Sequence, residues 1–200
     1  MNKIKLAGIV VSSVELSHTF LGENFYKFDI ESERTSGNTD KLPCIVPQML
    51  VGDIKEGAKI ALNGEIRSRN ERDEISTHCR LAVFVTEVSD YLGYDENSVE
   101  LEGFICKEPK YRKTPAGREI CDVLIASNRE RSNKSDYIPC ITWGRNAVRT
   151  SLMKVSDKVK VFGRFQSRDY TKRYENDVEE IKTALEVSVN IISEVADDES

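Results

Sequence analysis

Hydrophobic and polar residues alternate in short stretches along most of this 200-residue chain. Such alternation predicts β-strands, because successive side chains of a strand point to opposite faces of a sheet. In the second half of the chain, the stretches that we interpret as strands are residues 99–105, 120–126, 137–143, 158–165 and 184–192. We therefore expect five strands there, and Pro115-Ala116-Gly117 predicts a hairpin turn between the first two.

One segment follows a different period. Val148, Leu152 and Val155 stand at helical spacing within residues 146–155, which predicts the one helix of this half. Five strands with a helix between the third and the fourth is the order of the OB-fold, a Greek-key barrel that binds oligonucleotides on one face.

An internal repeat extends this prediction to the whole chain. Residues 4–8 match residues 99–103 at an offset of 95, and residues 42–45 match residues 138–141 at an offset of 96. Gly64 matches Gly163 at an offset of 99. A slowly growing offset with the matches in unchanged order indicates one domain duplicated, with small loop insertions.

We therefore predict an all-β chain of two tandem OB-folds, each a five-stranded Greek-key barrel with one short helix between strands 3 and 4. The expected boundaries are residues 1–90 for a diverged N-terminal barrel and 98–193 for the C-terminal barrel, with an acidic tail over 194–200. The short acidic stretch 90–97 is expected to join the two.

Charge is distributed unevenly along the chain, whose formal net charge is -5. Residues 1–96 carry 11 Lys and Arg against 16 Asp and Glu, whereas residues 97–177 carry 17 against 11. In this basic segment the cations alternate with tyrosines and the single tryptophan. Cations that follow phosphates and rings that stack on bases are what a groove for an unpaired strand needs. Composition alone leaves a solvated charged face as an equal alternative.

Residue content argues against most kinds of catalysis. The only histidines are His18 and His78, and none of the five cysteines forms a Cys-x-x-Cys pair, as expected for a protein of a reducing cytosol. The sequence has no Gly-rich phosphate loop and no nucleophile with a paired histidine. Residues 42–52, the longest stretch without a charge, are too few to cross a bilayer. We expect no enzymatic activity, no catalytic residues, no cofactor, no bound metal and no membrane association.

Five pieces in the second half resemble the bacterial single-stranded DNA-binding protein family in sequence and order. They are Asn97-Ser98-Val99-Glu100-Leu101-Glu102-Gly103, the stretch from Glu108 to Gly117, Ala126-Ser127-Asn128-Arg129, the stretch from Tyr137 to Arg145, and the stretch from Gly163 to Tyr170. The resemblance covers about half of the chain, and through the repeat it extends to residues 4–88. It implies a protein that binds and protects single-stranded DNA without sequence specificity in replication, repair or recombination.

The resemblance also implies which residues contact the strand. The stacking positions of the family fall on Trp143, Tyr137 and Tyr170, and a further one falls on Arg131, whose guanidinium plane would stack in place of a ring. The expected phosphate-binding residues are Arg112, Lys113, Arg129, Arg145, Arg149 and Arg168. The alternative for the rings is a half-buried position in the barrel, and for each arginine it is a solvated face.

The first copy departs from the family at these positions. By the repeat, Trp143 corresponds to Pro47, Tyr137 to Lys41 and Tyr170 to Glu71. We therefore expect the N-terminal barrel to bind weakly and mainly to build the assembly, with a secondary path through Arg34, Arg67 and Arg69.

The remaining expectations concern partners and location. By analogy with family members that carry two OB-folds per chain, we expect a homodimer that presents four barrels, in the cytoplasm at the nucleoid. The chain stops in an acidic tail without the linker and apolar end that dock partner enzymes in the family, so we do not expect this tail to recruit repair enzymes. The alternatives are a protein-interaction module, such as a primosome accessory, and an RNA-binding OB protein.

Overall fold

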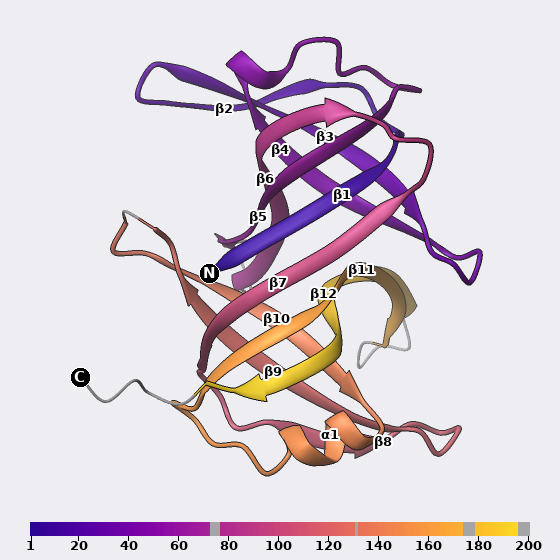
Figure 1. Cartoon of the computed structure of the whole chain (residues 1–200), viewed down its shortest axis with the longest axis vertical. Coiled ribbons are helices and arrows are strands. Elements are labelled where there is room, and N and C mark those ends of the chain that lie inside the picture. Colours follow the sequence, from indigo (N-terminus) through magenta and orange to yellow (C-terminus); the bar gives the residue numbers. More distant parts are fainter. Residues whose placement is uncertain (73–76, 131, 174–178, 196–200) are drawn as a thin grey trace.

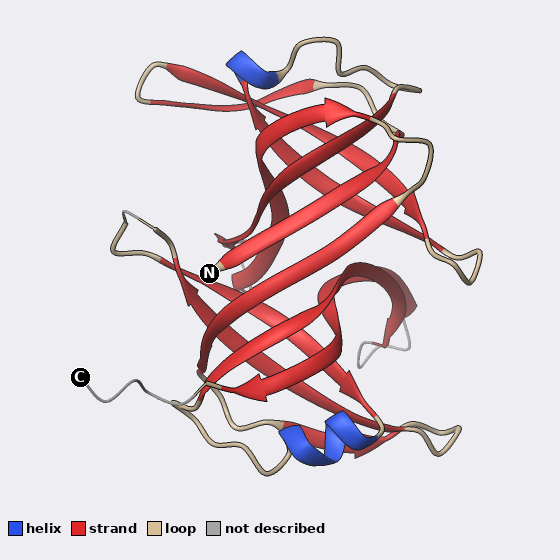
Figure 2. Ribbon diagram, in the orientation of Figure 1, coloured by secondary structure: helices blue, strands red, loops and turns tan. Residues whose placement is uncertain are grey.

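The structure, a computed structural model, describes residues 1–72, 77–130, 132–173 and 179–195. In these ranges the chain is mostly β-strand (Figure 2). The N-terminal half contains β1 (Asn2–Val10), β2 (Glu15–Phe20), β3 (Glu23–Glu33), β4 (Thr39–Pro47), the 3-10 helix η1 (Gln48–Leu50), β5 (Lys59–Arg72) and β6 (Thr77–Asp90). The C-terminal half contains β7 (Glu96–Ile105), β8 (Lys110–Lys113), β9 (Glu119–Asn128), β10 (Ser135–Trp143), α1 (Arg145–Thr150), β11 (Lys158–Arg173) and β12 (Glu179–Glu194).

The duplicated strand order is confirmed. All five strand stretches expected in the second half lie within strands, and β1, β3, β4, β5 and β6 repeat that order in the first half. Each half also has a short extra strand, β2 or β8, which forms a hairpin with the strand that follows it. One short helical segment follows the β4 strand and its counterpart β10, as predicted.

The two halves share one continuous sheet. β1 pairs antiparallel with β7, with Ile4 opposite Val99, and the two strands cross the middle of the molecule side by side (Figure 1). Buried apolar side chains of both halves form a single core cluster, which includes Ile4, Leu6, Val99 and Leu101. The repeat therefore builds two barrels that are joined along their first strands.

Each barrel closes where a glycine lets two strands approach. β1 pairs with β3 in addition to β5, and β7 pairs with β9 in addition to β11. A Cβ atom on Gly103 would overlap the backbone oxygen of Ala126, and one on Gly8 would overlap that of Glu31. Glycine therefore recurs at this position of the repeat because only a residue without a side chain fits there.

The helix of the C-terminal half differs from the sequence prediction. It is six residues long, and its buried side chains are Ala147 and Thr150. Val148 and the two other apolar residues that suggested the helix, Leu152 and Val155, are exposed. The small residues of the segment face the barrel because the helix packs closely against β9 and β10, which leaves the larger apolar residues outside.

Two buried aspartates connect the halves at equivalent positions. Asp136 Oδ1 accepts the backbone N–H of Ser68 at 2.6 Å, and Asp40 Oδ1 accepts that of Ser167 at 3.0 Å. Both serine hydroxyls accept in return a backbone N–H from the partner half, from Tyr137 at 2.8 Å and from Lys41 at 3.0 Å. The arrangement repeats with the sequence, so the two halves contact each other with pseudo-two-fold symmetry.

Candidate nucleic-acid interface

The outer face of β10 presents the two aromatic residues that the sequence predicted on this strand. Alternation directs Ile138 and Cys140 into the core, whereas Tyr137 and Trp143 point outward and are 48% and 37% exposed. The indole is neither enclosed by the barrel nor fully exposed, so one part of it packs against the protein and another part is free for contact. This position allows a base to stack without unfolding any element.

Tyr170 lies on the outer face of the neighbouring hairpin of β11 and β12. Its ring centroid is 5.9 Å from the guanidinium carbon of Arg168, which orients both side chains. Arg168 also pairs with Glu186 at 3.4 Å on β12. β12 pairs with β10 on its other edge, so Tyr170 and Trp143 belong to one outward surface of adjacent strands.

Arg112 reaches this surface from β8. In the strand register it lies opposite Ile120, which itself lies opposite Trp143, so the three side chains form a row across three strands. Arg112 Nε donates to Asp122 Oδ2 at 2.9 Å, and this hydrogen bond raises the pKa of the guanidinium. Lys113 follows Arg112 in the strand and points to the opposite face because successive side chains alternate.

Two of the predicted phosphate-binding residues lie on the short helix that follows Trp143. Arg145 and Arg149 on α1 are both exposed. Among the residues that the structure describes, neither has a carboxylate within ion-pair distance. Their charges are therefore available to a ligand that passes the indole.

Arg129 occupies a different environment from the other predicted cations. Its guanidinium donates to both oxygens of Asp136, at 2.8 and 2.6 Å, and to the backbone oxygen of Ser68 at 3.2 Å. The Asp136 carboxyl group is buried. Arg129 thus belongs to the contact between the halves, as Arg34 does beside Asp40 in the first copy. The predicted stacking residue Arg131 lies outside the described residues.

Sequence reasoning assigned no role to Arg164 on β11. Its guanidinium interacts with the charges of Arg34 and Asp40, which places it at the contact between the halves. Its Nε is buried and has no hydrogen-bond partner within the described part of the chain. Burial and the neighbouring charge of Arg34 lower the pKa of Arg164.

The corresponding face of the N-terminal half carries rings, although none of the three stacking rings of the C-terminal half is retained there. Phe25 on β3 lies between Pro47 and His18 in the register, as Ile120 lies between Trp143 and Arg112. The imidazole of His18 stacks on Phe25 with the ring centroids 4.9 Å apart and the planes at 8°. The offset of 95 aligns Phe25 with Ile120. Both residues are hydrophobic, so the alignment of the two copies does not draw attention to the aromatic ring in the first.

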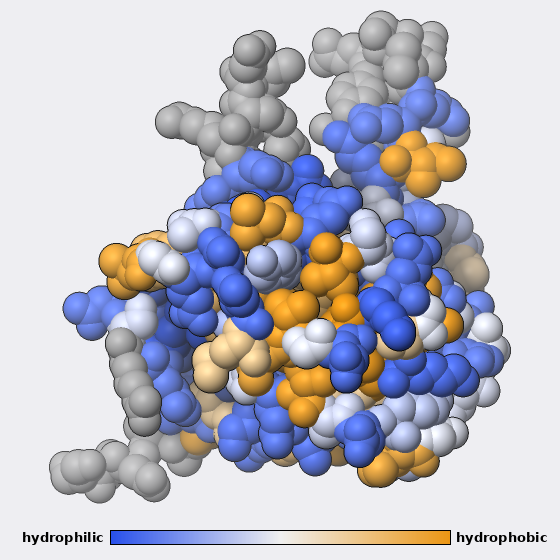
Figure 3. Space-filling view, turned by 90° about the horizontal axis from the view of Figure 1, so that it is seen from above, coloured by the Kyte–Doolittle hydropathy of each residue, from blue (hydrophilic) through white to orange (hydrophobic). Residues whose placement is uncertain are grey.

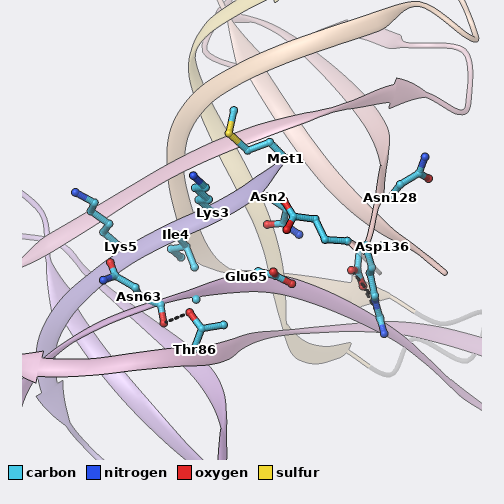
Figure 4. Close-up of a pocket in the computed structure, with 13 residues that line it drawn as sticks. Met1, Asn2, Lys3, Ile4, Lys5, Asn63, Glu65, Thr86, Asn128 and Asp136 are labelled. Carbon is cyan, nitrogen blue, oxygen red and sulfur yellow. Dashed lines mark hydrogen bonds and ion pairs between the residues drawn. The ribbon is translucent and has the colours of Figure 1, made fainter. Parts of the chain in front are cut away.

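A small polar pocket marks the contact between the halves. Met1, Asn2, Lys3 and Lys5 on one side and Glu65, Thr86, Asn128 and Asp136 on the other line a volume of about 360 Å3 (Figure 4). The Thr86 hydroxyl donates to the backbone oxygen of Asn63 at 3.2 Å. Lysines and carboxylates balance one another here, and the pocket belongs to the connection between the barrels.

Buried thiols fill space in the core. Burial raises the pKa of Cys44 and Cys140 far above the ordinary range, and it raises the pKa of Cys121 to about 11. Across the described ranges no group of histidine, cysteine, aspartate and glutamate is arranged to hold a metal ion. The helices in the same ranges are too short to cross a bilayer.

Comparison with known proteins identifies the family. The model of the single-strand binding protein family matches residues 96–194. Single-stranded DNA-binding protein A of Bacillus subtilis is 36% identical over 80 residues, which cover 37% of this chain and 46% of that protein. Single-stranded DNA-binding protein B of the same organism is 38% identical over 80 residues, which cover 37% of this chain and 71% of that protein. The match thus spans about half of the first relative and most of the second.

Solved structures resemble the whole chain. The crystal structure of the wild-type single-stranded DNA-binding protein from Thermus aquaticus superposes with a TM-score of 0.79 at 16% identity, covering 100% of this chain and 95% of that one. A deletion mutant of the same protein gives a TM-score of 0.75 at 18% identity, with 99% and 96% covered. At this identity the likeness concerns the fold, which is therefore shared by both halves. Taken with the match to the Bacillus subtilis relatives, it follows that the chain belongs to the single-strand binding protein family.

Proposed function

We propose that the protein binds single-stranded DNA without sequence specificity, mainly on the outward surface of the C-terminal half. The observation that carries this proposal is that Trp143, Tyr137 and Tyr170 are partly exposed on one surface of adjacent strands. Every base offers a face for stacking, so a row of rings accepts any sequence. The names of the Bacillus subtilis relatives agree with this ligand.

Cations around the rings would bind the phosphates. Arg112, Arg145, Arg149 and Arg168 border the surface. Each phosphate contact releases condensed counterions, which favours binding at low salt. Lys113 remains a candidate phosphate-binding residue for a DNA strand that crosses the edge of β8. We leave Arg129 out of this set because its charge is already neutralised by Asp136.

The role that follows is protection and not catalysis. A strand bound along these rings has its bases covered, which prevents re-pairing and shields it in replication, repair and recombination. Such a role places the protein in the cytoplasm, at the nucleoid. The acidic tail, expected not to recruit repair enzymes, lies almost wholly outside the described residues.

We also propose a homodimer that presents four barrels. Phe162 on β11 and Ile191 on β12 face each other in the register and are both exposed, and Phe104 is exposed on the adjoining β7. Apolar residues gathered on the outside of a sheet are typical of a surface that another chain covers. Ile191 lies on β12, the strand next to β10, so the dimer that we propose has to leave the indole of Trp143 uncovered.

The decisive experiment uses the single tryptophan as its own reporter. Adding oligo-dT at low salt should quench the emission of Trp143, and raising the salt should restore it. If the emission does not respond at low salt, the protein is a docking module and the proposal is wrong. Tighter binding of poly-U than of poly-dT in competition would identify RNA as the ligand instead.

A further inference from the structure

The two ends of the molecule are built from equivalent elements of the repeat. The hairpin of β2 and β3 lies at one end, and the hairpin of β8 and β9 lies at the other (Figure 1). Figure 2 shows the short helical segments, η1 and α1, at the same two ends. We call residues 15–25 and 48–58 the N-terminal pole, and residues 110–120 and 144–157 the C-terminal pole.

The two poles carry opposite charge. The N-terminal pole contains one cation and four carboxylates, whereas the C-terminal pole contains seven cations and two carboxylates. Some of these groups are exposed and have no ion pair among the described residues. They are Glu23, Asp53 and Glu56 at the N-terminal pole, and Lys110, Arg118 and Lys154 at the C-terminal pole. The three cations are not in the proposed phosphate-binding set, so their charges are available to the carboxylates of another molecule.

Exposed apolar side chains accompany the charges at both poles. At the N-terminal pole they are Phe20, Leu21 and Met49, and at the C-terminal pole they are Val148, Leu152 and Val155. Seen from the end formed by the N-terminal half, hydrophobic residues are exposed among hydrophilic ones (Figure 3). The aliphatic side chains of the C-terminal pole offer no ring on which a base could stack, so binding of a strand does not account for their exposure.

Leu21 adopts a backbone conformation that is uncommon for a residue with a side chain. It forms the two-residue turn between β2 and β3 together with Gly22, and its φ is 49°. Turns of this kind favour asparagine, aspartate or glycine at this position. The side chain of Leu21 is 90% exposed, so it adds little to the core of the barrel. A leucine at this position is explained by contact with another molecule.

We propose that the N-terminal pole of one copy of the protein docks on the C-terminal pole of the next copy bound to the same DNA strand. The chain itself supplies both surfaces, since carboxylates and apolar side chains at one end match cations and apolar side chains at the other. A contact between two different surfaces of identical chains leaves one pole free on each outer copy, so further copies can add. The inference rests on the proposed function, which places successive copies on one strand.

The strand makes a weak contact between copies effective. Two copies on neighbouring segments of one strand are held at a high effective concentration, whereas free copies meet only at their concentration in solution. The contact therefore appears as tighter binding of a second copy beside the first. Coupling between two binding events commonly changes affinity by about 5- to 150-fold, which is the range that we expect.

Two lengths of oligo-dT separate binding of DNA from contact between copies. Quenching of Trp143 in the natural full-length protein gives the length that one protein unit covers, and affinity is then measured on this length and on twice this length. The cooperativity ratio is the affinity of the second unit on the double length divided by the affinity on the single length. A ratio of one overturns the inference and leaves the proposed function intact. No quenching on either length contradicts both.

Charge reversal with rescue identifies the surfaces in contact. Glu23→Lys with Asp53→Lys at the N-terminal pole should lower the cooperativity ratio to about one, because like charges then meet. Arg118→Glu with Lys154→Glu at the C-terminal pole should do the same. The variant with all four changes exchanges the signs of the two poles and should restore the ratio. A ratio that either double variant leaves unchanged, or that the combined variant fails to restore, overturns the inference.

A matched control tests for an effect of overall charge. Lys3→Glu with Lys5→Glu changes the net charge as much as the double variant of the C-terminal pole does. Both lysines are exposed on β1, which crosses the middle of the molecule, so the ratio should stay as in the natural protein. An equal loss of cooperativity in this control overturns the assignment to the poles.

Leu21→Asn separates contact from folding. Asparagine suits the turn, so the melting temperature should not fall, while the loss of the apolar side chain should lower the cooperativity ratio. An unchanged ratio in this variant contradicts the role that we assign to Leu21 in the contact.

Discussion

Asp136 accepts the backbone N–H of Ser68 at 2.6 Å, so a carboxylate of the C-terminal half binds a strand of the N-terminal half. The same carboxylate neutralises Arg129. An arginine that resembles a phosphate ligand in the sequence thus contributes to the joint between the two barrels.

We expect Asp136→Asn to destabilise the protein by about 2 kcal/mol, because it leaves the charge of Arg129 without its partner in a largely buried site. Urea unfolding followed by circular dichroism measures the loss. The matched control is Glu100→Gln, which breaks the more exposed pair with Lys160 and should destabilise the protein much less. Equal effects of the two variants would contradict the role that we assign to Asp136.

Trp143→Ala should weaken binding of oligo-dT at least tenfold, because stacking of one base contributes about 1 to 3 kcal/mol. The melting temperature should change little, since the indole is 37% exposed. Fluorescence anisotropy of labelled oligo-dT measures the affinity. Tyr94→Ala, an exposed ring in the connection between the halves, should leave the affinity unchanged. Unfolding of the Trp143 variant would show that the ring belongs to the core.

Replacing Arg145 and Arg149 together by alanine should weaken binding of all sequences alike. If each contacts one phosphate, the salt dependence of the affinity should fall by ~1.4 on logarithmic scales, because a single strand contributes about 0.7 per contact. Titrations at four salt concentrations give this slope. An unchanged slope would mean that the two arginines face only solvent.

Gly103→Ala should destabilise the C-terminal barrel by about 1 to 3 kcal/mol, since its methyl group would overlap the backbone oxygen of Ala126. Gly22→Ala is a useful comparison: its Cβ would meet no atom, and any cost comes from its φ of +82° alone. Thermal unfolding compares the two. A larger loss at Gly22 would contradict the explanation from strand closure.

Stability should fall as the pH rises above about 9. Burial raises the pKa of Cys121 from 9.0 to about 11 and raises those of Cys44 and Cys140 further, so the folded state keeps these protons while the unfolded state releases them. The stabilisation is complete below the pKa of the unfolded thiols and is lost as the pH rises towards the folded values. Urea midpoints between pH 8 and pH 11 test this, and the combined Cys121→Ala and Cys140→Ala variant should show a shallower decline than the natural chain.

The order of residues was enough to predict the repeated architecture. Alternation of hydrophobic and polar residues indicates the strands, because one face of each strand must be buried. The matched glycines recur because the duplicated barrels close at the same point. Alternation also directs Tyr137 and Trp143 outward together, so the exposed rings of β10 followed from the order of residues. The helix expected over 146–155 is shorter in the structure, Arg145–Thr150, and its buried face differs from the prediction, because close packing selected Ala147 and Thr150 over larger apolar neighbours.

Which charges are free and which are paired became clear from the folded chain alone. The pairing of Arg129 with Asp136, the orphan Nε of Arg164 and the stack of His18 on Phe25 each depend on strand register and on contacts between residues far apart in the chain. A charge count along the sequence assigned the N-terminal half an acidic, weakly binding character. Folding pairs Arg129 with Asp136 and Arg67 with Glu65, since neighbours in space and not in sequence determine the local potential.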